Sequence, residues 1–280
     1  MAIKITSYST CDIGHLAQER NIGILSMMVT LGDKSFHDGI DITPQDIFDF
    51  VAETKNLPKT SAPSIGDYEE FFAEQLKDAD EVIHFNISGK SSGSHNMAKQ
   101  AAESFNGKVR VIDSKALSTG QGLLVLKAAD LRDAGKTSAE IEEEVCALRD
   151  RVNTSFVPDR LDYLFKGGRC SRMTLYGANL LKIHPKIAME DGQLFAAGKY
   201  RGDMKMCIKK YVEELKNQYP TYEKTRCFVT HSSADADLVA LAKDLVKEHF
   251  QFDEIIETVA GSIITSHCGR NTLGVLFIAE

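Results

Sequence analysis

Buried runs and amphipathic stretches alternate through the first half of the chain. Runs rich in Val, Ile and Phe, with little polar alternation, predict buried strands, and stretches with a 3.6-residue apolar period predict helices between them. Strands are expected at residues 3–7, 21–32, 80–88 and 108–114, and helices are expected to begin near residues 43, 64, 97, 120 and 137. Strand–helix alternation with fully buried strands predicts an N-terminal α/β domain with a parallel sheet, over residues 1–155.

The second half of the chain has a different pattern. Two apolar runs meet at Asp191-Gly192, a typical hairpin turn, and amphipathic helices are expected at residues 208–215 and 238–250. Further strands are expected at residues 226–231, 254–260, 262–267 and 272–279. We therefore expect a C-terminal α+β domain on a largely antiparallel sheet, over residues 156–280.

Capping signals mark the start of three expected helices. Thr43 stands before Pro44, and two capping boxes have the required spacing, Ser64 with Asp67 and Thr137 with Glu140. These signals place the helix starts more firmly than apolar periodicity does, because each one satisfies N–H groups that the helix itself leaves without a partner.

Composition excludes several classes of protein. The chain has 280 residues, 43% of them hydrophobic, and a net charge of −7, so no basic surplus is present to neutralise a nucleic acid. No apolar run has the length of a membrane span, and the first ten residues lack the apolar core of a signal peptide, which predicts a cytoplasmic protein. The six cysteines form no C-x-x-C pair, so we expect reduced thiols and no zinc or other metal site.

A serine-rich segment follows the strand expected at residues 80–88. Residues 88–94, here called the serine loop, read "SGKSSGS" and lead into an Ala-containing helix. Hydroxyls and free N–H groups at a helix N-terminus suit an anion. A nucleotide P-loop is unfavoured, because His84 stands where the Walker A pattern requires glycine. An ordinary helix cap is the alternative interpretation.

Three other segments carry candidate chemistry. Thr60 and Ser61 offer adjacent hydroxyls between two prolines, and His267 stands at the end of an apolar run. Arg169 and Arg201 lie in separate glycine-containing basic turns, an arrangement that suits a phosphate or an acidic partner. Each segment taken alone is also compatible with an ordinary loop, a core histidine or a solvated charged turn.

Six motifs together resemble one family. "TSAPS", "SSGS", "VIDSKALSTGQGLLVL", "LDYLFKGGRCS", "KYRG" and "SHCGRNTLG" occur in the order found in the DegV family, from about Ile3 to the C-terminus. The resemblance implies a two-domain fold with a long-chain fatty acid, such as palmitate or stearate, in the cleft between the domains. It also implies that the protein acts as the fatty-acid-binding subunit of a bacterial fatty acid kinase, and presents the carboxylate to a separate ATP-using catalytic subunit that makes the acyl phosphate.

The resemblance also implies roles for individual residues. No residue is expected to be catalytic, and no cofactor beyond the bound fatty acid is implied. The carboxylate-binding positions fall on Thr60 and Ser92, with Ser61, Gly93 and His267 nearby, and the partner-facing positions fall on Arg169 and Arg201. The chain departs from the family pattern at Tyr8 (usually acidic), His95 (usually Tyr) and Arg270-Asn271 (usually Pro-Gly).

Two other functions stay open at the level of sequence. The first is a hydrolase or transferase that uses Ser92 or Cys268 with His267, although the chain has no G-x-S-x-G motif. The second is a nucleotide-binding, kinase-like protein, since the fold implied by the resemblance is related to that of dihydroxyacetone kinase. The absence of Walker A and G-x-G-x-x-G motifs disfavours it.

Overall fold

The computed structural model describes residues 1–169 and 183–280 and contains two main sheets. The first is parallel and has the order β2-β1-β6-β7. Its strands are β1 (Ile3–Tyr8), β2 (Gly23–Leu25), β6 (Glu81–Asn86) and β7 (Val109–Asp113). Cys170, within one of the quoted motifs, lies outside the described residues.

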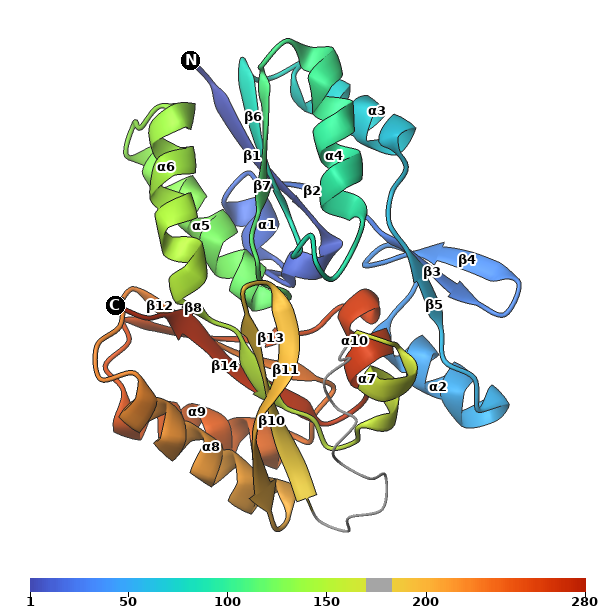
Figure 1. Ribbon diagram of the computed structural model, residues 1–280, viewed down its shortest axis with the longest axis vertical. Helices are drawn as coiled ribbons and strands as arrows, with labels where there is room; N and C mark the ends of the chain where they lie inside the picture. Colours follow the sequence, from blue (N-terminus) through green and yellow to red (C-terminus); the bar gives the residue numbers. More distant parts are fainter. Residues whose placement is uncertain (170–182) are drawn as a thin grey trace.

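Helices cover both faces of this parallel sheet (Figure 1). One face carries α3 (Ile65–Gln75) and α4 (Ser94–Ala102), and the other carries α5 (Thr119–Asp133) and α6 (Ser138–Leu148). The short helix α1 (Leu16–Glu19) lies between β1 and β2. This arrangement confirms the expected α/β fold with a parallel N-terminal sheet.

The second sheet is antiparallel except for the β12–β13 pair, and its main order is β11-β10-β9-β14-β12-β13. Its strands are β8 (Val152–Asn153), β9 (Ser155–Val157), β10 (Ile183–Glu190), β11 (Gln193–Arg201), β12 (Arg226–Ser232), β13 (Glu254–Val259) and β14 (Thr272–Ile278). The chain therefore joins this sheet at residue 152, and the predicted boundary at residues 155 and 156 falls within β9.

Two amphipathic helices, α8 (Met204–Gln218) and α9 (Ala236–His249), pack together against the second sheet. Their buried side chains meet Val229, Val275 and Phe277 on one face of the sheet. The opposite face presents Phe228 and Leu276 to α5, which packs on the first sheet with its other side. Because both of its faces are covered, every residue of β14 is buried.

A small third sheet and two short helices lie beside this junction (Figure 1). The sheet has the order β4-β3-β5, with strands β3 (Met28–Leu31), β4 (Lys34–His37) and β5 (Lys59–Ser61). Helix α2 (Pro44–Thr54) connects β4 to β5, and the short helices are α7 (Asp162–Lys166) and α10 (Ser262–Cys268).

The structure confirms the expected capping signals and the hairpin. Complete capping boxes begin α2, α3 and α6 at Thr43, Ser64 and Thr137. The β10–β11 turn places Asp191 at φ 46° and Gly192 at φ 76°, the left-handed conformations that two-residue hairpins favour.

Two strand predictions were wrong. Residues 262–267 form helix α10, because a short and largely buried run has no periodicity that separates a strand from a helix. The single strand expected at residues 21–32 is two strands, since β2 pairs with β1 whereas β3 pairs with β4 and β5.

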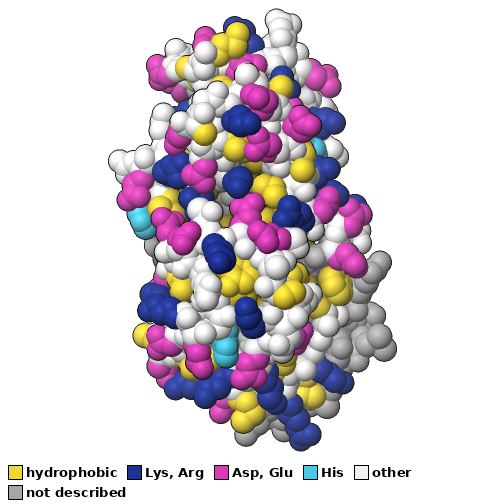
Figure 2. All heavy atoms as spheres, turned by 90° about the vertical axis from the view of Figure 1, so that its left-hand side faces the viewer, with side chains coloured by type: hydrophobic (Ala, Val, Ile, Leu, Met, Phe, Trp, Pro, Cys, Tyr) yellow, Lys and Arg dark blue, Asp and Glu magenta, His cyan; other side chains and the backbone are white. Residues whose placement is uncertain are grey.

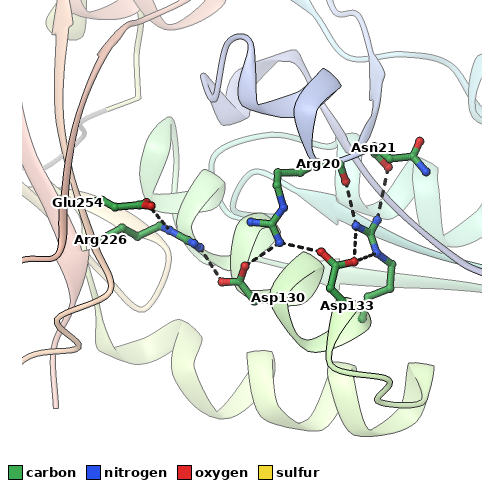
Figure 3. Close-up of polar contacts among 7 residues, drawn as sticks. Arg20, Asn21, Asp130, Asp133, Arg226 and Glu254 are labelled. Carbon is green, nitrogen blue, oxygen red and sulfur yellow. Dashed lines mark hydrogen bonds and ion pairs between the residues drawn. The ribbon is translucent and has the colours of Figure 1, made fainter.

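An ion-pair network links the end of α5 to the second sheet (Figure 3). Asp130 accepts hydrogen bonds from Arg226 of β12 at 2.8 Å and from Arg20 at 2.7 Å. Arg20 also donates to Asp133 at 2.9 Å, and Arg132 pairs with the same carboxylate. A network of partly buried charges holds this geometry better than isolated surface pairs do.

Basic and acidic side chains are mixed on one side of the described surface. Figure 2 shows Lys and Arg side chains interspersed with Asp and Glu on the side that carries α6, α8 and α9.

Among the described residues, no helix has both the length and the apolar character that crossing a bilayer requires.

The contact of α5 with the β1–α1 connection predicts opposite effects for two glycine substitutions. A Cβ at Gly122 would lie 2.5 Å from Ile13 Cγ2 and 2.7 Å from the Cys11 carbonyl oxygen, whereas a Cβ at Gly66, in the first turn of α3, meets only Ser64 Oγ at 3.8 Å. Gly122→Ala should lower the free energy of unfolding by about 2–3 kcal/mol. Gly66→Ala should raise it by about 0.5–1 kcal/mol. Urea denaturation measures both, and equal effects would contradict the close packing of α5.

Candidate functional site

Three distant segments meet in one cavity at the junction of the two main sheets. Thr60 comes from β5, Ser92 from the serine loop and His267 from the last turn of α10. The cavity, here called the junction cavity, has a volume of about 60 Å³. Its other described wall residues are Thr10, Met27, Ile87, Ser91, Leu117, Leu164, Arg169, Leu194, Ile263, Ile264 and Cys268.

Thr60 and His267 contact each other directly. Thr60 Oγ1 and His267 Nε2 share a hydrogen bond of 3.0 Å across 207 residues of sequence. Thr60 is held by the pairing of β5 with β3, where it lies opposite Val29. The two polar groups are therefore fixed by separate elements and share one hydrogen bond inside the cavity.

The serine loop divides its hydroxyls between two tasks. Ser88 Oγ donates to the Gly192 carbonyl at 2.7 Å, so this hydroxyl docks the loop on the β10–β11 turn. Ser94 Oγ bonds to the hydroxyl of Tyr8 beneath the loop. Ser92 is half-buried in the cavity wall, and its Oγ accepts the Ser94 N–H at 3.3 Å. The loop therefore presents Ser91 and Ser92 to the cavity, whereas Ser88 and Ser94 support it.

His267 is neutral at neutral pH. Burial, with a smaller contribution from the Arg169 guanidinium, lowers the pKa of the imidazole to about 4. Its Nδ1 is buried without a hydrogen-bond partner among the described residues. Gly167, at the end of α7, lies so close to the ring that a Cβ there would be 2.9 Å from Nδ1. Only glycine therefore allows the backbone to approach the ring at this position.

The junction cavity combines neutral hydrogen-bonding groups with an apolar wall. Arg169 is the only described wall residue that carries a charge at neutral pH, and its exposed side chain donates to the Gly167 carbonyl at 2.7 Å. Hydroxyls and a neutral imidazole can bind the oxygens of an anion without burying a counter-charge. The apolar side chains beyond them suit a hydrocarbon.

A second cavity of about 30 Å³, here called the deeper cavity, lies beside the first on the side of the second sheet. Leu117, Ile264 and Cys268 line both cavities, so these three side chains separate them. Phe156 and Leu276 lie in the wall of the deeper cavity. The two cavities thus mark a path from the polar groups into the core between the sheets.

Three sequence-predicted residues do not line the junction cavity. Ser61 follows Thr60 on β5, and its exposed side chain lies on the opposite face of the strand. Gly93 is exposed at the N-cap of α4. Arg201 ends β11, eight residues after Gln193, which is roughly 26 Å of extended strand away from the turn beside the serine loop.

The described residues give little support to nucleophilic chemistry. Burial raises the pKa of the Cys268 thiol to about 12, so the thiolate that could act as a nucleophile is scarce. The hydrogen bond of His267 goes to Thr60 and leaves Ser92 without a basic partner in the described part of the chain. Over the same residues, no cluster of three His, Cys, Asp or Glu side chains could hold a metal ion.

Sequence reasoning missed the apolar wall of the cavity. Met27, Leu117 and Ile264 have the sequence signature of ordinary core residues, and no local signal separates a cavity wall from a filled core. Tyr8 drew attention only as a departure from a family pattern, yet its side chain supports the serine loop from below.

Fold and cavity together define a mixed α/β protein with a polar-mouthed apolar cavity between two sheets. A family model described as "uncharacterised protein, DegV family" matches residues 2–280, and the chain belongs to the DegV family.

Several relatives match over nearly their whole length. A DegV domain-containing protein of Clostridium acetobutylicum is 32% identical, covering 99% of both chains. A fatty acid-binding protein of Thermotoga maritima is also 32% identical, covering 98% of this chain and 96% of that one. A DegV family protein of Thermus thermophilus, whose structure is described as showing fatty acid binding, has a TM-score of 0.93 at 29% identity with full coverage of both chains.

The lowered pKa of His267 predicts a specific loss of stability in acid. The unfolded chain takes up a proton near pH 6.5, whereas the folded protein does so only near pH 4, so this contribution is present above pH 6.5 and lost as the pH falls toward 4. Between pH 7 and pH 4.5, the wild type should lose roughly 2 kcal/mol more than His267→Gln. Urea denaturation at the two pH values measures this, and parallel losses would contradict a neutral buried imidazole.

Proposed function

We propose that this protein binds one long-chain fatty acid, such as palmitate or stearate, with its carboxylate at Thr60, Ser92 and His267. The observation that carries the proposal is the convergence of these three groups, from three separate elements, at one end of an apolar cavity. The fatty-acid binding described for relatives from Thermotoga maritima and Thermus thermophilus supports it.

The free energy of burying an acyl chain favours a fatty acid as the ligand. Burying about fifteen methylenes at about 0.8 kcal/mol each gives a gross gain near 12 kcal/mol, before the costs of association and ordering. An unpaired buried carboxylate would cancel much of that gain. Hydroxyls of Thr60 and Ser92 and an imidazole N–H of His267 supply the missing hydrogen bonds, and the tail extends past Leu117 and Ile264 toward the deeper cavity.

We propose that a second protein reaches the carboxylate from the side of Arg169. Arg169 is exposed at the wall of the junction cavity, beside Ser91 and His267. We assign the protein the role of a cytoplasmic, non-catalytic subunit that presents the acid to a separate fatty acid kinase catalytic subunit. In that reaction a carboxylate oxygen forms a bond to the γ-phosphorus of ATP, and ADP leaves. Arg169 and Arg201 are the proposed partner-facing residues.

Removing the head-group hydroxyls tests the binding proposal. Thr60→Ala and Ser92→Ala should each weaken palmitate binding by about 1–3 kcal/mol, the usual cost of losing a hydrogen bond to a charged group. Titration calorimetry measures the affinity, and native mass spectrometry of the purified wild type should show about one bound acyl chain. Thr30→Ala on β3 and Ser104→Ala after α4 are matched controls, since their hydroxyls bond to Ser35 and Glu69 away from the cavity. A wild type that neither retains nor binds a fatty acid would refute the proposal.

Substituting the two arginines tests the partner role separately. Arg169→Ala and Arg201→Ala should leave palmitate affinity within about twofold, since neither side chain supplies the hydrogen bonds proposed for the carboxylate. Acyl-phosphate formation with a fatty acid kinase catalytic subunit and ATP should fall, and the gap to the wild type should narrow as salt screens the contact. Lys77→Ala, at the end of α3, is the control for loss of an exposed cation. Weakened lipid binding with normal phosphorylation would instead assign the arginines to the ligand.

A further inference from the structure

A buried polar network lies directly beneath the serine loop. Tyr8, the last residue of β1, is fully buried, and its hydroxyl bonds to Oγ of Ser94, the residue whose N–H approaches Ser92 Oγ. Ser94 begins α4 and is itself fully buried. Ser92 is the one half-buried member of this trio, so the network meets the junction cavity at Ser92.

The layer below the trio is equally closed to solvent. Asn86 Nδ2 donates to the Tyr68 hydroxyl at 3.0 Å, and both residues are fully buried. Burial raises the pKa of both phenols, that of Tyr8 to about 12, so each phenol keeps its proton at physiological pH. The network is therefore neutral, and each of its hydroxyls has one proton to donate.

The start of α4 supplies an internal donor to Ser92. The Ser94 N–H approaches Ser92 Oγ at 3.3 Å, so this oxygen accepts from within the protein and keeps its own proton for a ligand in the cavity. The Tyr8 hydroxyl bonds to Ser94 Oγ and thereby holds the residue that makes this contact. The chain of contacts therefore runs from Tyr8 through Ser94 to Ser92, and successive hydrogen bonds polarise one another.

We infer that Tyr8 is a positioning residue for the anionic head group, which holds the Ser92 hydroxyl with its proton directed into the junction cavity. The inference rests on the proposed function and goes beyond it, because Tyr8 is not among the wall residues of the cavity. Without the phenol oxygen, Ser94 loses the partner that fixes it, and the Ser92 hydroxyl that accepts the Ser94 N–H loses its fixed direction. The effect should be specific to ligands that need a strong donor, such as a carboxylate.

Tyr8→Phe removes one oxygen and leaves the aromatic packing in place. The affinity for myristate should fall roughly tenfold, the value of one hydrogen bond to a charged group. The affinity for 1-tetradecanol, which has the same tail without the charge, should stay within about twofold. Tyr200→Phe is the matched control, since this buried tyrosine donates to Glu214 Oε2 at 2.7 Å on the other main sheet, and neither residue lines the two cavities. It should cost stability and leave both affinities unchanged.

A double-mutant cycle identifies the path of the effect. If Tyr8 acts through Ser92, Tyr8→Phe should add less than twofold to the loss of myristate affinity in Ser92→Ala. Ser94→Ala breaks the same chain between Tyr8 and Ser92, and it replaces Tyr8→Phe if that variant does not fold.

The other outcomes of these measurements contradict either the inference or the proposed function. Equal loss of myristate and alcohol affinity in Tyr8→Phe would make Tyr8 a packing residue and overturn the inference. Full retention of myristate affinity, or additive losses in the cycle, would also overturn it. A wild type that binds neither ligand would instead refute the proposed function on which the inference rests.

Discussion

Helix α10 depends on two buried Asp carboxyl groups at its first turn. Asp12 Oδ1 accepts the Gly261 N–H at 2.9 Å, and Asp38 Oδ1 accepts the Ser262 N–H at 2.7 Å. A seven-residue helix has little stability of its own, so partners from the first half of the chain must fix it in place. Burial raises the pKa of Asp12 to about 8 despite its hydrogen bonds, which shows that the desolvation of this carboxyl is only partly offset. Asp12 and Asp38 thus fix the position of α10, and with it the positions of His267 and of the apolar wall residues that α10 contributes.

The same helix shows where local sequence signals end. Capping boxes and the Asp191-Gly192 turn were predicted correctly because the groups that satisfy each signal lie within a few residues of it. Ile263, Ile264 and Thr265 are β-branched and favour a strand locally. They are helical because Asp12 and Asp38, more than 220 residues away, bind the N–H groups at the start of the segment. No window of sequence contains both the segment and the residues that determine its conformation.

The site residues that could be predicted from the sequence are those whose own side chains can bind an anion. Thr60, Ser92 and His267 attracted attention as polar groups in recognisable motifs, and the structure brings them to one cavity. Ser61 and Gly93 were included as neighbours in sequence, but adjacent residues of a strand lie on opposite faces and an N-cap glycine has no side chain to contribute. Leu117 and Ile264 were missed, because a residue of the cavity wall and a residue of the filled core have the same kind of side chain. They differ only in whether a cavity lies beside them.

The neutrality of the junction cavity separates affinity from reactivity. A buried lysine or arginine would bind a carboxylate strongly, but the ion pair would also withdraw charge from the oxygen that attacks phosphorus in the proposed reaction. At the proposed carboxylate position the groups are two hydroxyls and a neutral imidazole, backed by a neutral phenol, and the charge of Arg169 lies at the exposed rim. In the proposed complex, burial of the tail therefore provides most of the binding free energy, and the polar groups need only replace water. In the proposed reaction this division leaves the carboxylate oxygen available for transfer by a second protein, which a site built on charge would oppose.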